Sequence, residues 1–187
     1  MQFRSHTANQ GVLIMYLHSG KKLSHSIVLL ALLVASSTAA TAATVTTTFT
    51  VSATVLSSCA VSATNLAFGS YDPNAATDNN ATSAVTVTCT LLTPYHVQLN
   101  EGVNSVGGAV TARRMKGPGA SDYLNYALYQ DASRTLNWGK TDGVDTVDDT
   151  GAGILLPVAH TVYGRITKNQ DVNTGAYSDT ITVTVSY

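Results

Sequence analysis

The residues of this chain that could form a covalent cross-link are its two cysteines, Cys59 and Cys89. In an exported protein an even number of cysteines usually forms disulfides. This pair would close a loop of about 31 residues, which contributes roughly 3.5–4 kcal/mol in the chain-entropy model. Neither cysteine has another Cys or a His at metal-ligand spacing. We therefore expect a disulfide and no zinc site, with two buried free thiols as the alternative.

Groups suited to acid–base or nucleophilic catalysis are sparse. Behind the leader described below, the only histidines are His96 and His160, and alternation in its strand places His96 toward solvent. Gly139-Lys140-Thr141 resembles the end of a phosphate-binding loop, but the glycine required upstream falls at Arg134. No G-x-S-x-G elbow exists. We predict no catalytic residue, no cofactor site and no enzyme, with a secreted hydrolase as a minor alternative.

The acidic run Asp142–Asp149 is the remaining candidate for ion binding. A helix–loop–helix calcium site needs carboxylates at fixed positions, a central glycine and a closing Glu, whereas the only Glu of this chain is Glu101. We interpret the run as a solvated loop and predict no metal ligands. Trp138, just before it, is expected to pack over the rim of the fold.

The first 42 residues read as an export signal. Lys21 and Lys22 precede an apolar run at 27–35, and small residues follow up to Ala40-Thr41-Ala42. About nine apolar residues are too few for a membrane span, which needs roughly twenty, although a membrane anchor is the alternative. We predict a signal peptide over residues 1–42, with Met1 or Met15 as the start.

Charge in the remaining chain argues against polyanionic partners. Three of the ten Lys and Arg residues lie in the predicted signal peptide, so the rest of the chain carries a net charge of about −4. Because it has no basic patch, we expect neither nucleic-acid nor anionic-membrane binding.

The segment Thr44–Leu56, which follows the predicted signal peptide, alternates between apolar and polar residues with a period of two. Val45, Phe49, Val51, Ala53 and Val55 share one face, with Thr47 as its one polar member, and Thr or Ser residues form the other. This pattern predicts a β-strand with one buried face. The pattern alone favours pairing within the chain's own sheet.

Further strands are predicted along the chain by the same alternation, and no sustained helical period is found behind the leader. About seven strands, separated by turn-rich segments, predict an antiparallel β-sandwich. Besides the leading strand, the clearest runs are 83–91, 94–100, 122–130, 158–168 and 176–187. We expect loops at 71–80, 101–121 and 131–153.

Several of these motifs, in this order, resemble the spore coat protein U domain, which is the pilin domain of Csu-type archaic chaperone–usher pili. The leading strand runs into the first cysteine (Thr48–Val61), a phenylalanine-glycine strand follows (Leu66–Ser70), and the second cysteine lies in a V-T-V-T-C strand. A Y-x-L-Y-x-D-x-x-R segment (Tyr126–Arg134) precedes the Tyr-ending last strand (Tyr177–Tyr187). Together these motifs span almost all of the chain behind the leader.

The resemblance implies an incomplete immunoglobulin-like sandwich whose missing strand leaves a hydrophobic groove. It favours residues 43–56 as a donor strand for another molecule and 57–187 as the pilin domain, with the five apolar residues above as plugs. The expected partners are a periplasmic chaperone, an outer-membrane usher and neighbouring subunits. The expected function is that of a surface pilus subunit, exported through the periplasm, supporting adhesion and biofilm formation. A non-fibrous coat protein and a self-contained binding sandwich are the alternatives.

Overall fold

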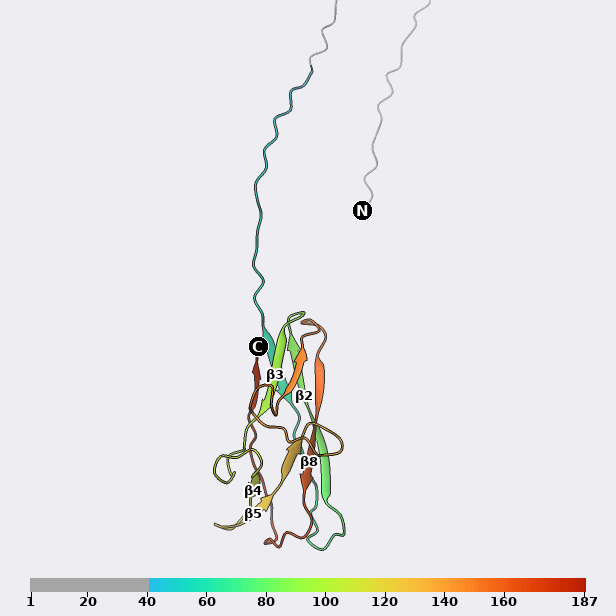
Figure 1. Ribbon diagram of the computed structural model, residues 1–187, viewed down its shortest axis with the longest axis vertical. Coiled ribbons are helices and arrows are strands. Elements are labelled where there is room, and N and C mark those ends of the chain that lie inside the picture. The colour runs from blue at the N-terminus through green and yellow to red at the C-terminus, as the bar shows by residue number, and fades with distance from the viewer. Residues whose placement is uncertain (1–40) are drawn as a thin grey trace, which may run out of the picture. The chain divides into compact units, whose positions relative to one another are not determined.

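The computed structural model describes residues 41–187; the predicted signal peptide lies outside the described residues except for its last two positions. Residues 51–187 form one compact all-β unit (Figure 1). Among the described residues no helix is long and apolar enough to cross a membrane. Within the described residues nine strands follow one another: β1 (Cys59–Ala63), β2 (Asn79–Cys89), β3 (Pro94–Leu99), β4 (Arg114–Lys116), β5 (Tyr123–Asn125), β6 (Ala127–Tyr129), β7 (Val147–Thr150), β8 (Val158–Ile166) and β9 (Val183–Ser186).

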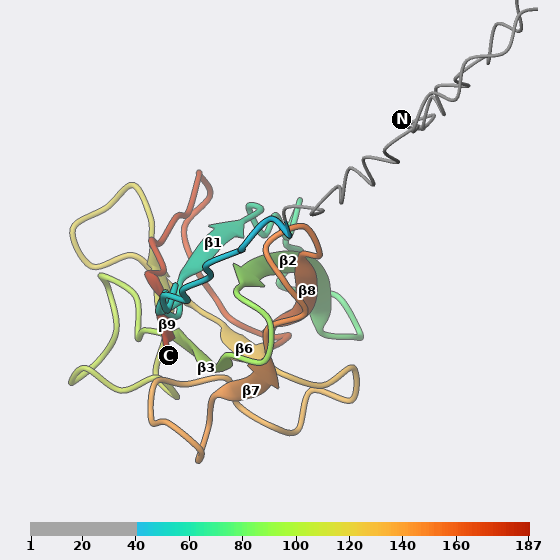
Figure 2. The same cartoon turned by 90° about the horizontal axis from the view of Figure 1, so that it is seen from above.

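The strands form antiparallel sheets that face each other across the core (Figures 1 and 2). One sheet has the order β1-β2-β8-β6 and the other the order β7-β3-β9, while β4 and β5 form a separate ribbon. The longest strand pair of the first sheet is β2–β8, which runs from Asn79 opposite Ile166 to Val87 opposite Val158. The expected antiparallel β-sandwich is confirmed.

The core is built by the inward faces that the alternation predicts. Along β3, and from Val85 to Cys89 of β2, every second side chain is buried, because side chains of a strand point alternately to the two faces. Its fully or almost fully buried members are Val85, Val87, Cys89, Tyr95, Val97, Leu99, Leu124, Leu128, Trp138, Val162 and Ile166.

The segment predicted as one strand over 122–130 is broken in the structure. Tyr126 separates β5, which pairs with β4, from β6, which pairs with β8 in the first sheet. The backbone N–H of Tyr126 donates to the carbonyl of Arg113, so the chain leaves one pairing partner for another at this residue. Alternation continues through such a crossing, and a pattern of period two therefore cannot reveal it.

Other boundaries also differ from the sequence-based expectation. The phenylalanine-glycine segment Leu66–Ser70 lies outside the strands, and the first strand is β1 instead. Strands β4 and β7 lie in regions predicted as loops. The last strand begins only at Val183, because β3 supplies ladder partners no earlier.

Two buried polar side chains, those of Trp138 and Arg113, tie loop segments to the second sheet by hydrogen bonds to backbone carbonyls. Trp138, expected at the rim, is completely buried, and its indole N–H donates to the carbonyl of Val97 at 2.8 Å. The guanidinium of Arg113 is also completely buried and donates to the carbonyls of Leu99, Asn100 and Trp138. Burial lowers the pKa of Arg113 to about 10, so it stays charged at neutral pH.

Candidate functional site

An open seam runs between the two sheets where β1 and β9 come together. β1 is the edge of one sheet and β9 is the edge of the other, and the two lie next to each other (Figure 2). Among the strands of residues 41–187, β1 pairs only with β2, and β9 pairs only with β3. Both strand edges on this side of the sandwich are therefore free to pair with a further strand.

Two adjoining cavities of about 510 and 590 Å³ lie along this seam. Their shared walls are the segment that follows β1 and the segment that precedes β9, and we call them together the seam groove. Both cavities are lined by Leu66, Phe68, Met115 and Tyr177. The first cavity also reaches the core side chains Val85, Leu99, Leu128 and Val162 and the partly buried Ile181 and Val183.

The hydrogen bonds of the chain before β9 indicate which of its edges is open. Ser178 exchanges backbone hydrogen bonds with Lys116, and Thr182 accepts one from Asn100. These even-numbered residues therefore face the second sheet and its ribbon. In an extended chain the backbone groups of alternate residues point in opposite directions, so those of Tyr177, Asp179 and Ile181 face the seam groove. Their side chains are half-buried and turn toward the core.

One carboxylate fixes the middle of this wall. Asp179 accepts hydrogen bonds from the backbone N–H of Val103 at 3.0 Å, from the side-chain amide of Asn104 at 2.9 Å and from the hydroxyl of Tyr126 at 2.7 Å. Burial and the bond to Asp179 raise the pKa of Tyr126, which stays protonated and donating. The same ring packs edge-on against Phe68 from the opposite wall, with centroids 6.3 Å apart. The two walls are thus held at a defined separation.

The predicted donor segment pairs with no strand of its own chain in the described structure. Residues 41–58 have no strand assignment and, in all of 41–58, the side chains are exposed. The predicted plugs Val45, Phe49, Val51 and Val55 are 82–97% exposed, and Ala53 is exposed as well. The expectation from the pattern alone, pairing within the chain's own sheet, is therefore wrong for these residues.

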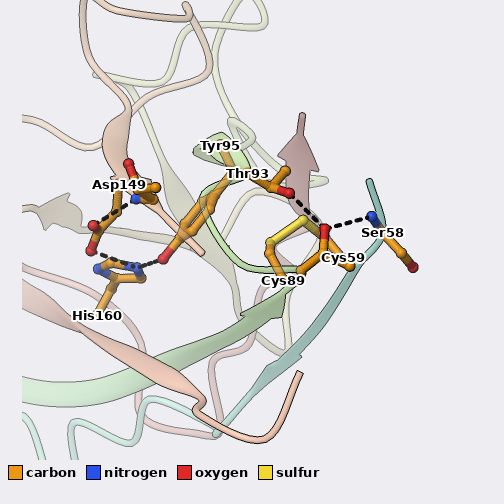
Figure 3. The surroundings of a disulfide bond; sticks show 9 residues. Ser58, Cys59, Cys89, Thr93, Tyr95, Asp149 and His160 are labelled. Carbon is orange, nitrogen blue, oxygen red and sulfur yellow. Dashed lines mark hydrogen bonds and ion pairs between the residues drawn. A yellow bond between two sulfur atoms is a disulfide. The ribbon is translucent and has the colours of Figure 1, made fainter. Parts of the chain in front are cut away.

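A disulfide fastens the strand that follows the donor segment. Cys59, at the start of β1, is bonded to Cys89, at the end of β2, and the two residues are also register partners (Figure 3). The predicted disulfide is present, and no cysteine is free. Ser58 and Thr90 continue the pairing by two hydrogen bonds, 2.9 and 3.2 Å long. The cross-link therefore anchors the root of an otherwise unpaired segment.

Tyr95, His160 and Asp149 form a polar cluster near the disulfide (Figure 3). The Tyr95 hydroxyl lies 2.9 Å from Nε2 of His160, whose other neighbour is Asp149 at 3.9 Å (Figure 3). Burial raises the pKa of Tyr95 and lowers that of His160. The protonated phenol of Tyr95 therefore joins β3 to β8 through its contact with His160.

The remaining polar candidates serve the local structure. His96, expected toward solvent, is partly exposed and contacts Asp148 with its Nδ1 at 2.7 Å. Lys140 of the Gly-Lys-Thr sequence pairs with Glu101. Asp145 of the acidic run accepts from the backbone N–H of Thr141. Within residues 41–187, no three His, Cys, Asp or Glu side chains are grouped to hold a metal ion.

Comparison with solved structures identifies the class of fold. A chain of the CsuC–CsuE chaperone–tip adhesion subunit pre-assembly complex, from archaic chaperone–usher Csu pili of Acinetobacter baumannii, superposes with a TM-score of 0.52 at 24% identity. The match covers 72% of this chain and 40% of that chain, so this chain spans less than half of the solved one. The fold of this chain resembles that of a Csu pilin subunit.

Sequence comparison identifies the family. The Spore Coat Protein U domain matches residues 45–184, and Protein U of Myxococcus xanthus is 38% identical over 133 residues, which make up 65% of this chain and 71% of Protein U. The chain belongs to the Spore Coat Protein U domain family. The family match begins at Val45, so it includes the exposed N-terminal segment as well as the sandwich.

Proposed function

We propose that this protein is a structural subunit of a surface filament and polymerises by donor-strand complementation. In this function the N-terminal segment, residues 43–56, fills the seam groove of a neighbouring copy. The observation that carries the proposal is the pairing of two unsatisfied features in one chain. The chain has an apolar groove with open strand edges, and it also has an exposed segment of alternating apolar residues that belongs to no sheet.

The alternating part of the donor segment has the length of the longest strand of the sandwich, β2, which also has eleven residues. The eleven residues Val45–Val55 extend about 36 Å, roughly the length of a long strand pair in a sandwich. Burying five apolar side chains at about 1–3 kcal/mol each contributes on the order of 10 kcal/mol before ordering costs. Main-chain hydrogen bonds to the open edges add affinity, as in other cases of β-augmentation.

Donation from head to tail is a heterologous contact, which propagates as a filament instead of closing as a dimer. The same groove would need a temporary occupant before assembly, because an open apolar edge is an aggregation hazard. A periplasmic chaperone fits this need, and the solved CsuC–CsuE complex to which this fold is similar is a chaperone–subunit complex. An outer-membrane usher, a location on the cell surface, and a contribution to adhesion and biofilm formation complete the proposal.

The absence of enzymatic activity is part of the same proposal. The polar clusters described above hold loops and strands together, and the groove is lined mainly by apolar side chains. Such a lining suits a strand with alternating apolar residues. The second candidate is a non-fibrous coat protein, which the description of the matching family, Spore Coat Protein U domain, favours.

The experiment that tests the proposal removes the donor segment. The full chain and a variant lacking Ala43–Ala53 are each co-expressed with the cognate chaperone, and the secreted material is run unboiled on a denaturing gel. The full chain is expected to give a ladder of SDS-resistant multimers, and the shortened chain only a monomer bound to the chaperone. Ladders from the shortened chain would refute donor-strand exchange, and a full chain that never forms multimers would favour the coat protein.

A further inference from the structure

Five large aliphatic side chains are exposed at one end of the sandwich, and the groove does not use them. We call them the end patch: Leu91, Leu92, Ile154, Leu155 and Leu156, each 61–86% exposed. Single exposed apolar residues are ordinary, but a cluster of them marks an interaction surface.

Strand pairing places the two halves of the end patch at the same end. The loop after β7 starts beside β3, where Thr150 pairs with Pro94, and ends beside β2, where Val158 pairs with Val87. It therefore crosses from one sheet to the other at the end where β2 turns into β3 (Figure 1). The N–H of Leu92 donates to the carbonyl of Gly151 at 2.8 Å, which ties the turn to the loop.

The backbone conformation at position 92 is unfavourable for a leucine. Its φ is +60°, the left-handed region that Gly and Asn adopt most readily. Such a conformation costs an ordinary residue about 1–2 kcal/mol. The turn itself would be better served by glycine, so the aliphatic side chain has no local structural reason.

The donor segment leaves the domain at this same end. Ser58 is hydrogen-bonded to Thr90, the residue directly before Leu91. The last predicted plug, Val55, is separated from Cys59 of the donor's own β1 by four residue steps, which span at most about 14 Å. When Val55 sits in an acceptor groove, the end patch must therefore lie close to the mouth of that groove.

We propose that the end patch is a second contact surface between copies of this chain, packing against the rim of the groove into which the neighbouring donor segment is inserted. This inference rests on the proposed function. The patch restricts rotation between consecutive subunits, since a four-residue tether alone is a flexible hinge. A filament with the patch intact is then stiffer than one held together by the donor strand only.

Hydroxyl-radical footprinting of assembled filaments tests the inference, with Val103 and Val144 as internal controls. These two valines are 71% and 79% exposed, comparable with the patch, and lie in other loops. After correction for intrinsic reactivity, the five patch residues are expected to oxidise several-fold more slowly than the two controls. Equal corrected rates in a sample that shows SDS-resistant ladders would overturn the inference and leave the proposed function standing. A sample without ladders and with a reactive patch would overturn both the inference and the proposed function.

A matched pair of variants supplies the second measurement. Leu92→Asp with Leu155→Asp changes the patch, and Val103→Asp with Val144→Asp changes equally exposed positions elsewhere. Both variants are expected to give wild-type ladders, because neither alters the groove or the donor segment. Only the patch variant is expected to give filaments with a several-fold shorter persistence length in electron micrographs. Unchanged stiffness, or a loss confined to attachment on a hydrophobic bead, would assign the patch to another partner and overturn the inference.

Discussion

Phe49 offers the sharpest test of the energetics of strand donation. It is the largest side chain among the predicted plugs and is 87% exposed in the subunit, so replacing it changes no contact that stabilises the folded domain. Burying a phenylalanine contributes roughly 1.5–3 kcal/mol. Since 1.4 kcal/mol corresponds to a tenfold change in an equilibrium constant, Phe49→Ala is expected to weaken strand binding by about ten- to a hundredfold.

Phe49→Asp adds the cost of placing a carboxylate among the apolar side chains of the groove, several kcal/mol for an unpaired charge. We expect the ladder of SDS-resistant multimers to disappear while the melting temperature of the chaperone-released subunit stays unchanged. Thr48→Asp is the matched control, because Thr48 lies on the opposite face of the segment and would remain in solvent. Fibre yield equal to the wild type for Phe49→Asp, or equal losses for both variants, would refute the assignment of Phe49 as a plug.

Three further predictions concern the stability of the domain. Replacing Cys59 and Cys89 by alanine, or reducing them, is expected to lower the free energy of unfolding by about 3.5–4 kcal/mol, measured by urea denaturation; a change under about 1 kcal/mol would contradict the entropic role. Trp138→Phe leaves the buried carbonyl of Val97 without its donor and is expected to cost about 1–3 kcal/mol; an unchanged denaturation midpoint would show that water replaces the indole. Burial lowers the pKa of His160 in the folded state, so neutral His160 contributes fully to stability above the ordinary histidine pKa of about 6.5, and this contribution is lost as the pH falls below that value. Below about pH 6.5 the melting temperature of the wild type should drop more steeply than that of His160→Gln, and parallel curves would contradict this.

Alternation along the chain predicts the long central strands well. In β3 and in the second half of β2 every second side chain is buried, as the period of two predicts. β3 lies within the predicted run 94–100, whereas β2 begins at Asn79, four residues before the predicted run 83–91 and inside a segment predicted as a loop. The pairing of Cys59 with Cys89 follows from composition alone, because no other cysteine exists.

Short strands and buried polar groups could not be predicted, because their partners are distant in the sequence. β4 has three residues and exists through its pairing with β5. Arg113 is buried because carbonyls of Leu99, Asn100 and Trp138 converge on its guanidinium, and no local pattern announces this convergence. A basic residue beside Arg114 and Lys116 reads as a solvated cluster.

The seam groove, like the short strands, is formed by segments that are distant in the sequence. The alternation of Val45, Phe49 and Val51 predicts a strand with one buried face but contains no information on which sheet buries it. The groove arises where the edge of β1 meets the edge of β9, a juxtaposition set by the topology of the whole domain. Resemblance to a known family supplied the expectation of such a groove, which periodicity alone did not.

The most direct test of donor-strand assembly places a photoreactive phenylalanine analogue at position 49 and irradiates the assembled protein. The account predicts a cross-link between copies, recognised by peptides that join a light and an isotopically heavy chain. The attached peptide should come from the groove walls, 66–71 or 177–183. A cross-link formed only within one chain, or one between copies that maps outside both walls, would contradict the central claim.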